Sequence, residues 1–85
     1  MMKFEYVIRD NLGIHARPAG IIVREAAKYR SNITIQKGVK SVDAKKLFAL
    51  MSLGVKNADT IAVTFEGEDE DTAYEAIKQL IELNL

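Results

Sequence analysis

The chain has 85 residues, of which 48% are apolar and 28% are charged. We expect one small domain over residues 1–85 with a thin core, which excludes a second domain and a deep, enclosed active site. The absence of cysteine excludes disulfides and thiolate metal sites and fits a reducing, cytoplasmic environment. No apolar run approaches the roughly 18 residues of a membrane span, so we expect neither membrane insertion nor secretion.

The net charge of zero hides an uneven distribution. Residues 1–56 carry eleven Lys/Arg and four Asp/Glu, which gives a net charge of +7. Residues 57–85 carry one Lys/Arg and eight Asp/Glu, which gives a net charge of −7. The pI of about 6.6 lies well below the range typical of nucleic-acid-binding domains. We therefore expect an acidic protein partner and no nucleic acid.

The first half of the chain predicts a strand, a helix and a hairpin in that order. Apolar residues alternate with polar ones at Phe4, Tyr6 and Ile8, which indicates a half-buried strand. A spacing of three and four predicts an amphipathic helix through Ala19, Ile22, Val23, Ala26 and Ala27. Alternation returns at Ile33 and Ile35, and residues 40–43 follow the turn signal Lys37-Gly38 as the second strand of a hairpin.

The second half predicts a helix, a strand and a helix. An apolar stretch near residues 47–53 reads as a short helix, and Ile61, Val63 and Phe65 form the fourth strand. The last helix runs through Ala73, Ala76, Ile77, Leu80 and Ile81. Asp69 sits where an N-cap is expected, so the acidic run 66–71 is interpreted as a helix start and solvated surface, with no metal site.

These elements follow the order βαββαβα. We predict an α+β fold, a two-layer open-faced sandwich in which a four-stranded antiparallel sheet carries three helices on one face. The other face of the sheet is then open to water, and polar or charged residues fall on its outward positions, namely Glu5, Thr34, Thr64 and Glu66.

The candidate site is the segment Gly13–Gly20, which holds the only histidine and the only proline of the chain. Proline is tolerated in the first turn of a helix, so Pro18 predicts that the helix begins near Ala16 and that His15 is its N-cap. Gly13 and Pro18 would set the geometry of this turn.

A histidine at that position is suited to carry a phosphoryl group. The positive end of the helix dipole favours a neutral ring with a free nitrogen lone pair. The free backbone N–H groups of Ala16 and Arg17 could bind phosphoryl oxygens, and the guanidinium of Arg17 could add a charge-assisted contact.

The residues alone leave a plain alternative open, because a loop histidine beside an arginine is commonly a polar surface residue. Other catalytic arrangements have less support. There is no second histidine for a metal and no cysteine for thiol chemistry. A serine-histidine-acid arrangement is compatible with the composition, but a shallow domain offers it no cavity.

The segment Gly13–Ala19 resembles the active-site signature of the HPr family, the histidine-containing phosphocarriers of the bacterial phosphoenolpyruvate:sugar phosphotransferase system. The resemblance extends over chain length, element order, residues 44–55 and residues 66–70. It implies a phosphocarrier that is not an enzyme and needs no cofactor. It further implies that His15 accepts a phosphoryl group on Nδ1 from phosphorylated enzyme I and passes it to IIA domains of sugar permeases, assisted by Arg17.

Two positions depart from the family pattern. Lys46 stands where the family often carries a regulatory serine, so phosphorylation by HPr kinase at that position is impossible. Ser52, farther along the same helix, is read as an ordinary helix residue. Leu12 stands where many relatives have a polar residue near the phosphohistidine.

The short helix near residues 47–53 has too many apolar residues for one buried face. At about 100° per residue they cover an arc of roughly 220°. If Leu47, Leu50 and Leu53 face the core, Phe48 and Met51 emerge on the outer flank. This could be a leftover apolar patch, which small proteins commonly have.

We favour a docking function for this surface, because Met and Phe with a basic rim suit several acidic partners in turn. The candidate docking patch comprises Lys45, Lys46, Leu47, Phe48 and Met51. In the family the corresponding helix contacts enzyme I and the IIA domains.

The sequence predicts a cytoplasmic, monomeric phosphocarrier. The alternative within the family is a regulatory paralogue in a nitrogen-type phosphorelay. An alternative from another class is a small α+β nucleic-acid-binding module, which would need aromatic side chains on the open sheet face. Phe4, Tyr6 and Phe65 fall on the inward register, which disfavours that alternative.

Overall fold

The computed structural model describes all 85 residues as seven elements. In chain order they are β1 (Met2–Val7), α1 (Ala16–Ala26), β2 (Asn32–Lys37), β3 (Lys40–Asp43), α2 (Leu47–Ser52), β4 (Thr60–Glu66) and α3 (Glu70–Asn84). None of the three helices combines the length and the apolar character that crossing a bilayer requires.

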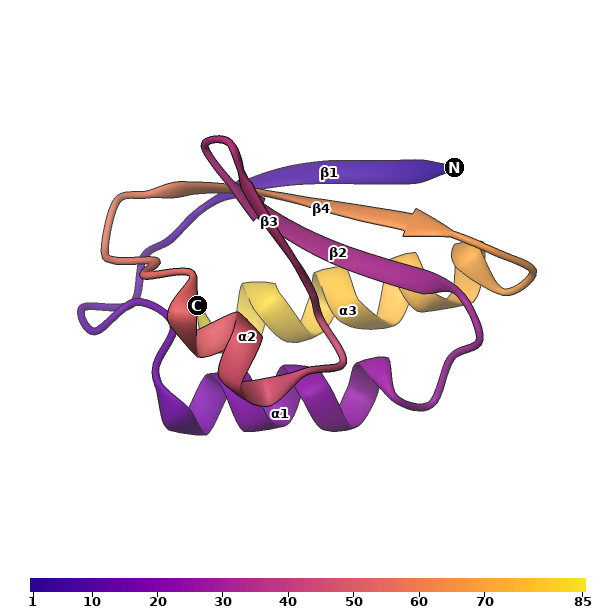
Figure 1. Cartoon of the computed structure of the whole chain (residues 1–85), viewed down its shortest axis with the longest axis horizontal. Helices are drawn as coiled ribbons and strands as arrows, with labels where there is room; N and C mark the ends of the chain where they lie inside the picture. Colours follow the sequence, from indigo (N-terminus) through magenta and orange to yellow (C-terminus); the bar gives the residue numbers. More distant parts are fainter.

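The four strands form one antiparallel sheet in the order β1-β4-β2-β3. All three helices lie on the same side of this sheet, so the molecule has two layers (Figure 1). The predicted α+β open-faced sandwich is confirmed. The structure follows from the pattern of the strands, because period-two alternation leaves each strand with one apolar face that the helices cover.

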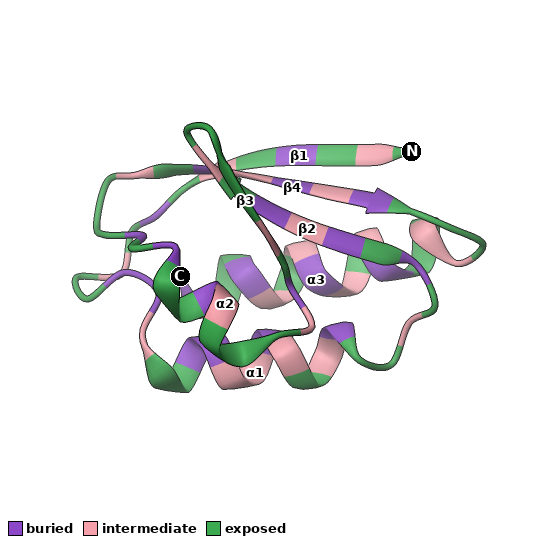
Figure 2. Cartoon of the chain, in the orientation of Figure 1, coloured by how far each residue is buried: buried purple, intermediate pink, exposed green.

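The core lies between the two layers, where 19 buried apolar residues form one cluster (Figure 2). In the sheet, Phe65 of β4 pairs with Ile33 of β2, and Val63 pairs with Phe4 on one side and Ile35 on the other. All three aromatic residues of the strands point inward, as predicted. The ring centroids of Phe4 and Phe65 lie 6.0 Å apart. Tyr6 packs against the core from a half-buried position.

The start of α1 matches the prediction from Pro18. The helix begins at Ala16, and His15 is its N-cap with extended backbone angles, φ −122° and ψ −174°. Pro18, Ala19 and Ile22 are buried in its apolar face. The proline therefore fixes where the chain leaves the β1–α1 loop, which places His15 at the helix terminus.

The start of α3 differs from the prediction in one respect. Asp69 is the N-cap residue, but its side chain does not cap its own helix. Its carboxylate accepts hydrogen bonds from the backbone N–H groups of Arg30 and Ser31, both 2.9 Å, and from the Ser31 hydroxyl at 2.5 Å. These bonds lower the pKa of Asp69 to about 2. The residue thus joins the α1–β2 loop to the start of α3.

Candidate functional site

The β1–α1 loop is held against the segment that follows α2. The backbone N–H of Ile14 donates to the carbonyl oxygen of Val55 at 3.1 Å. Gly13, with φ +69°, lies so close to this segment that a Cβ atom would stand 2.2 Å from the same oxygen. Only glycine fits both the left-handed backbone and the close approach. Gly13 therefore fixes the loop that carries His15.

The His15 ring is accessible, with 37% of its side-chain surface exposed. It makes no capping hydrogen bond to α1, so the ring is not engaged by the helix that it precedes. The backbone N–H groups of Ala16 and Arg17 have no acceptor in the structure, as expected for the first turn of a helix. The predicted combination of an available imidazole and free amide donors is present at one helix terminus.

His15 borders a shallow pocket of about 250 Å³. Its lining comes from the β1–α1 loop, the first turn of α1 and the end of α3: Asp10, His15, Arg17, Pro18, Leu83 and Asn84. The end of α3 is bound to the loop, since the N–H groups of Arg9 and Asp10 donate to the carbonyl oxygen of Leu85 at 2.6 and 2.7 Å (Figure 1). The two ends of the chain thus meet at the histidine: the segment from Asp10 to Pro18 and the end of α3.

Arg17 is exposed and forms no ion pair or side-chain hydrogen bond in the structure. Its guanidinium is therefore available to a ligand in the pocket. The side chains of Asn11 and Leu12 are both exposed, so neither is committed to the core. The structure brings Arg17 and Pro18 into the pocket with His15, as predicted.

Sequence reasoning missed Asp10. Its Oδ2 atom lies 3.6 Å from Nε2 of His15 and accepts a hydrogen bond from the backbone N–H of Leu12 at 2.9 Å. A local signal was available, because an aspartate whose side chain binds the N–H two residues later is a common way to begin a turn. The site therefore contains a carboxylate in addition to the predicted residues.

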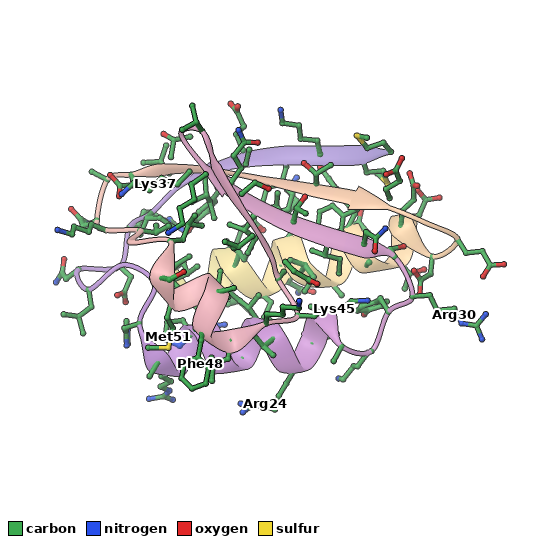
Figure 3. All side chains as sticks on the ribbon, in the orientation of Figure 1. Arg24, Arg30, Lys37, Lys45, Phe48 and Met51 are labelled. Carbon is green, nitrogen blue, oxygen red and sulfur yellow. The ribbon has the colours of Figure 1, made fainter.

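The surface of α2 agrees with the prediction in part. Phe48 is 83% exposed and Met51 is 38% exposed, while Leu50 and Leu53 are buried. Phe48 and Met51 lie side by side on the outer side of the helix (Figure 3). Leu47 does not meet the condition that it faces the core: it is 36% exposed and lies on the surface with the other apolar residues of the candidate docking patch.

The position of Leu47 has a geometric cause. The helix has six residues, Leu47–Ser52, so Leu47 is its first residue. The buried residue that precedes it is Ala44, which fills the core before the first turn. On the helix, four residues advance by about 40°, so Leu47 shares the outer flank with Met51.

The lysines near α2 differ in what they contact. The Nζ atom of Lys45 donates to the carbonyl oxygen of Tyr29 at 2.7 Å, so this half-buried amine is engaged within the fold. At the other end of the helix, Lys40 donates to the carbonyl oxygen of Ser52 at 2.9 Å, and Lys37 donates to that of Gly54 at 2.7 Å. Lys46 is exposed, as predicted.

Comparison with known proteins identifies the family. The family model described as the PTS HPr component phosphorylation site matches residues 2–83. The phosphocarrier protein HPr of Mycoplasma genitalium is 43% identical over 99% of this chain and 97% of its own length. That of Borreliella burgdorferi is 40% identical over 96% of this chain and 95% of its own length.

Solved structures agree with this result. A histidine-containing phosphocarrier protein of Mycoplasma superimposes with a TM-score of 0.91 at 39% identity, over 93% of this chain and 90% of that one. An HPr from Thermoanaerobacter tengcongensis gives a TM-score of 0.91 at 39% identity, over 96% and 92% of the two chains. With its fold, its histidine-bearing loop and these relatives, the chain belongs to the HPr family of phosphotransferase-system phosphocarriers, which carry phosphoryl groups and are not enzymes.

Proposed function

We propose that this chain accepts a phosphoryl group on Nδ1 of His15 from phosphorylated enzyme I and passes it to IIA domains of sugar permeases. The observation that carries the proposal is the position of an accessible His15 ring at the N-cap of α1, next to two backbone N–H groups without acceptors. Family membership supplies the carrier chemistry.

In the proposed reaction, the lone pair of Nδ1 attacks the phosphorus while the bond from phosphorus to the donor breaks in line with it. Such transfers depend mainly on positioning and on electrostatic stabilisation. The N–H groups of Ala16 and Arg17 would bind the phosphoryl oxygens, and the free guanidinium of Arg17 would pair with their charge. The partner supplies the rest of the site, since the pocket on this chain is shallow.

The docking patch would contact enzyme I and the IIA domains in turn. Phe48, Met51 and Leu47 give it an apolar centre of flexible side chains, which suits different partners. Lys46 adds a positive charge at its edge, which favours acidic partner surfaces. Lys45, the remaining residue of the patch, donates to the Tyr29 carbonyl within the fold.

The proposal includes a monomeric protein that acts in the cytoplasm as a single domain. A dimer occurs among the relatives, because one structure, 38% identical with a TM-score of 0.77, is that of an HPr dimer from Thermoanaerobacter tengcongensis. Analytical sedimentation measures the oligomeric state of the chain, with and without phosphorylation, and so tests whether it is a monomer.

The decisive experiment is phosphorylation of the purified chain by enzyme I and phosphoenolpyruvate. One acid-labile, base-stable phosphate per chain is expected, located on His15 by mass spectrometry, and addition of a IIA domain should remove it. The His15→Ala variant should fold and take up no phosphate, because a residue at an exposed N-cap contributes only about 1 kcal/mol to stability. Full labelling of that variant, or phosphate stable to acid, would refute the assignment.

A further inference from the structure

The carboxylate of Asp10 faces one particular nitrogen of the His15 ring. The Oδ2 atom of Asp10 faces Nε2 of the ring, not Nδ1, at 3.6 Å. We propose that Asp10 is a positioning residue for His15, whose carboxylate holds the ring proton on Nε2 and thereby leaves the lone pair of Nδ1 free for phosphoryl transfer. This inference rests on the proposed function for its consequence, but the position of the proton can be measured without it.

Asp10 is built into the loop, which is the first support for the proposal. Its side chain accepts from the N–H of Leu12 at 2.9 Å, and its own N–H donates to the carbonyl oxygen of Leu85 at 2.7 Å. Its carbonyl oxygen accepts from Nδ2 of Asn57 at 3.3 Å. The bond from Leu12 holds the carboxylate itself, and the other two hold the Asp10 backbone, so its position beside the ring is not that of a freely rotating surface side chain.

The second support is electrostatic. At 3.6 Å the two atoms are beyond hydrogen-bond distance, so in this geometry the carboxylate acts on the ring through its charge. An ionised carboxylate accepts hydrogen bonds and donates none, so it favours the neutral tautomer that carries its proton on the facing nitrogen. Histidines that act through one ring nitrogen commonly have the other nitrogen fixed in this way.

With the ring proton on Nε2, the transfer reaction needs no proton to leave or enter the ring. Nδ1 forms its bond to phosphorus as the donor's bond to phosphorus breaks, and the proton stays on Nε2 throughout. The phosphorylated ring then carries a positive charge beside the Asp10 carboxylate. When the phosphoryl group moves to the acceptor, the bond from Nδ1 to phosphorus breaks and the ring returns to its neutral form with the proton still on Nε2.

The test is the tautomer of the unphosphorylated ring, measured from the ¹⁵N chemical shifts of the two ring nitrogens at a pH where the ring is neutral. The wild type should carry the proton on Nε2. Asp10→Asn keeps an oxygen for the Leu12 N–H and removes the charge, so its population with the proton on Nδ1 should rise. Asp10→Glu, which retains the carboxylate, should recover part of the wild-type preference.

A matched control exists elsewhere in the chain. Asp43 binds the N–H of Lys45 at 2.9 Å in the same two-residue turn but takes no part in the His15 pocket. Asp43→Asn should leave the ring tautomer unchanged. If Asp10→Asn folds and keeps the wild-type tautomer, the proposal is overturned. If Asp10→Asn does not fold, an Asp10→Glu variant with no preference for Nε2 overturns it equally.

A kinetic measurement separates this inference from the proposed function. Both groups are about one-third exposed, so loss of the charge should slow phosphoryl capture from enzyme I by about threefold. A wild type that takes up no phosphoryl group, together with a tautomer that responds to Asp10→Asn, would refute the carrier proposal and retain the positioning contact. Equal capture rates together with an unchanged tautomer would refute the role of Asp10 and retain the carrier.

Discussion

The carbonyl oxygen of Val55 occupies the place that the Cβ of any residue at position 13 would need. The two would be 2.2 Å apart, and Gly13 has a φ of +69°. The loop that carries His15 and the segment after α2 are therefore packed backbone to backbone.

The first prediction follows from that contact. Gly13→Ala should destabilise the fold by about 1 to 3 kcal/mol more than Gly38→Ala, because it adds a steric overlap to the strain of a positive φ. Gly38 has nearly the same backbone, φ +60°, but open space around it. Urea unfolding of the two variants measures the difference. Equal losses would show that the loop can separate from Val55 without cost.

Local sequence signals were enough for the fold and for the position of His15. The alternation of apolar residues in strands and their three-to-four spacing in helices reflect which face of each element is buried. Pro18 restricts where a helix can start. The exposure of Leu47 follows from the start of α2 at this residue, which the apolar pattern near residues 47–53 does not locate. The contacts of Lys45 with Tyr29 and of Asp69 with Ser31 join residues far apart in sequence, so no local pattern indicates them.

The second prediction concerns acid unfolding. Asp69 has a pKa of about 2 in the fold against an ordinary value of 3.8, because Ser31 and Arg30 donate hydrogen bonds to its carboxylate. A lowered pKa means that this stability is fully present above pH 3.8 and is lost as the pH falls to about 2. Asp69→Asn should therefore unfold with a weaker pH dependence in this range, measured by thermal melts at several pH values.

A matched variant makes this result specific. Asp71 lies in the first turn of the same helix, is exposed and makes no hydrogen bond to the α1–β2 loop. Asp71→Asn should keep the wild-type pH dependence. If Asp69→Asn also keeps it, the bonds to Ser31 and Arg30 do not stabilise the fold through the ionised carboxylate.

The third prediction separates docking from packing on α2. Phe48→Ala should change stability by no more than about 0.5 kcal/mol and should weaken binding to enzyme I and to IIA domains, because the ring is largely exposed. Leu50→Ala, on the buried side of the same helix, should lower the free energy of unfolding by about 2 to 5 kcal/mol, because this side chain is buried. Thermal melts and binding titrations measure both. A large loss of stability in Phe48→Ala would remove the docking argument.

The fourth prediction tests how Arg17 acts. Arg17→Lys keeps the positive charge but loses the planar fork that can bind two phosphoryl oxygens at once. Phosphoryl capture should slow, while the melting temperature should stay unchanged because the side chain has no partner in the fold. Rapid-quench measurements with enzyme I give the rate. A rate equal to that of the wild type would mean that Arg17 contributes only its charge.

The fifth prediction concerns Lys46, which is exposed at the N-cap of α2. A charge at the edge of an interface acts mainly on the rate of association. Lys46→Glu should therefore slow capture by enzyme I, most strongly at low salt, and change dissociation less. Stopped-flow binding at two ionic strengths measures both rates. Lys3→Glu is the matched control, because it makes the same change of charge on an exposed residue of β1, in the other layer.

Lys46 also leads us to expect that this carrier is not regulated by serine phosphorylation. A phosphoserine would add a charge of about −1.5 to −2 beside the docking patch, whereas lysine fixes a positive charge that no kinase can reverse. Ser52 is no substitute, because its hydroxyl donates to the Ala49 carbonyl at 2.7 Å within α2. Incubation with HPr kinase and ATP should therefore leave the chain unmodified and fully competent to take a phosphoryl group from enzyme I. Stoichiometric phosphorylation of any serine, or an association rate indifferent to both Lys46→Glu and salt, would contradict a permanently active carrier.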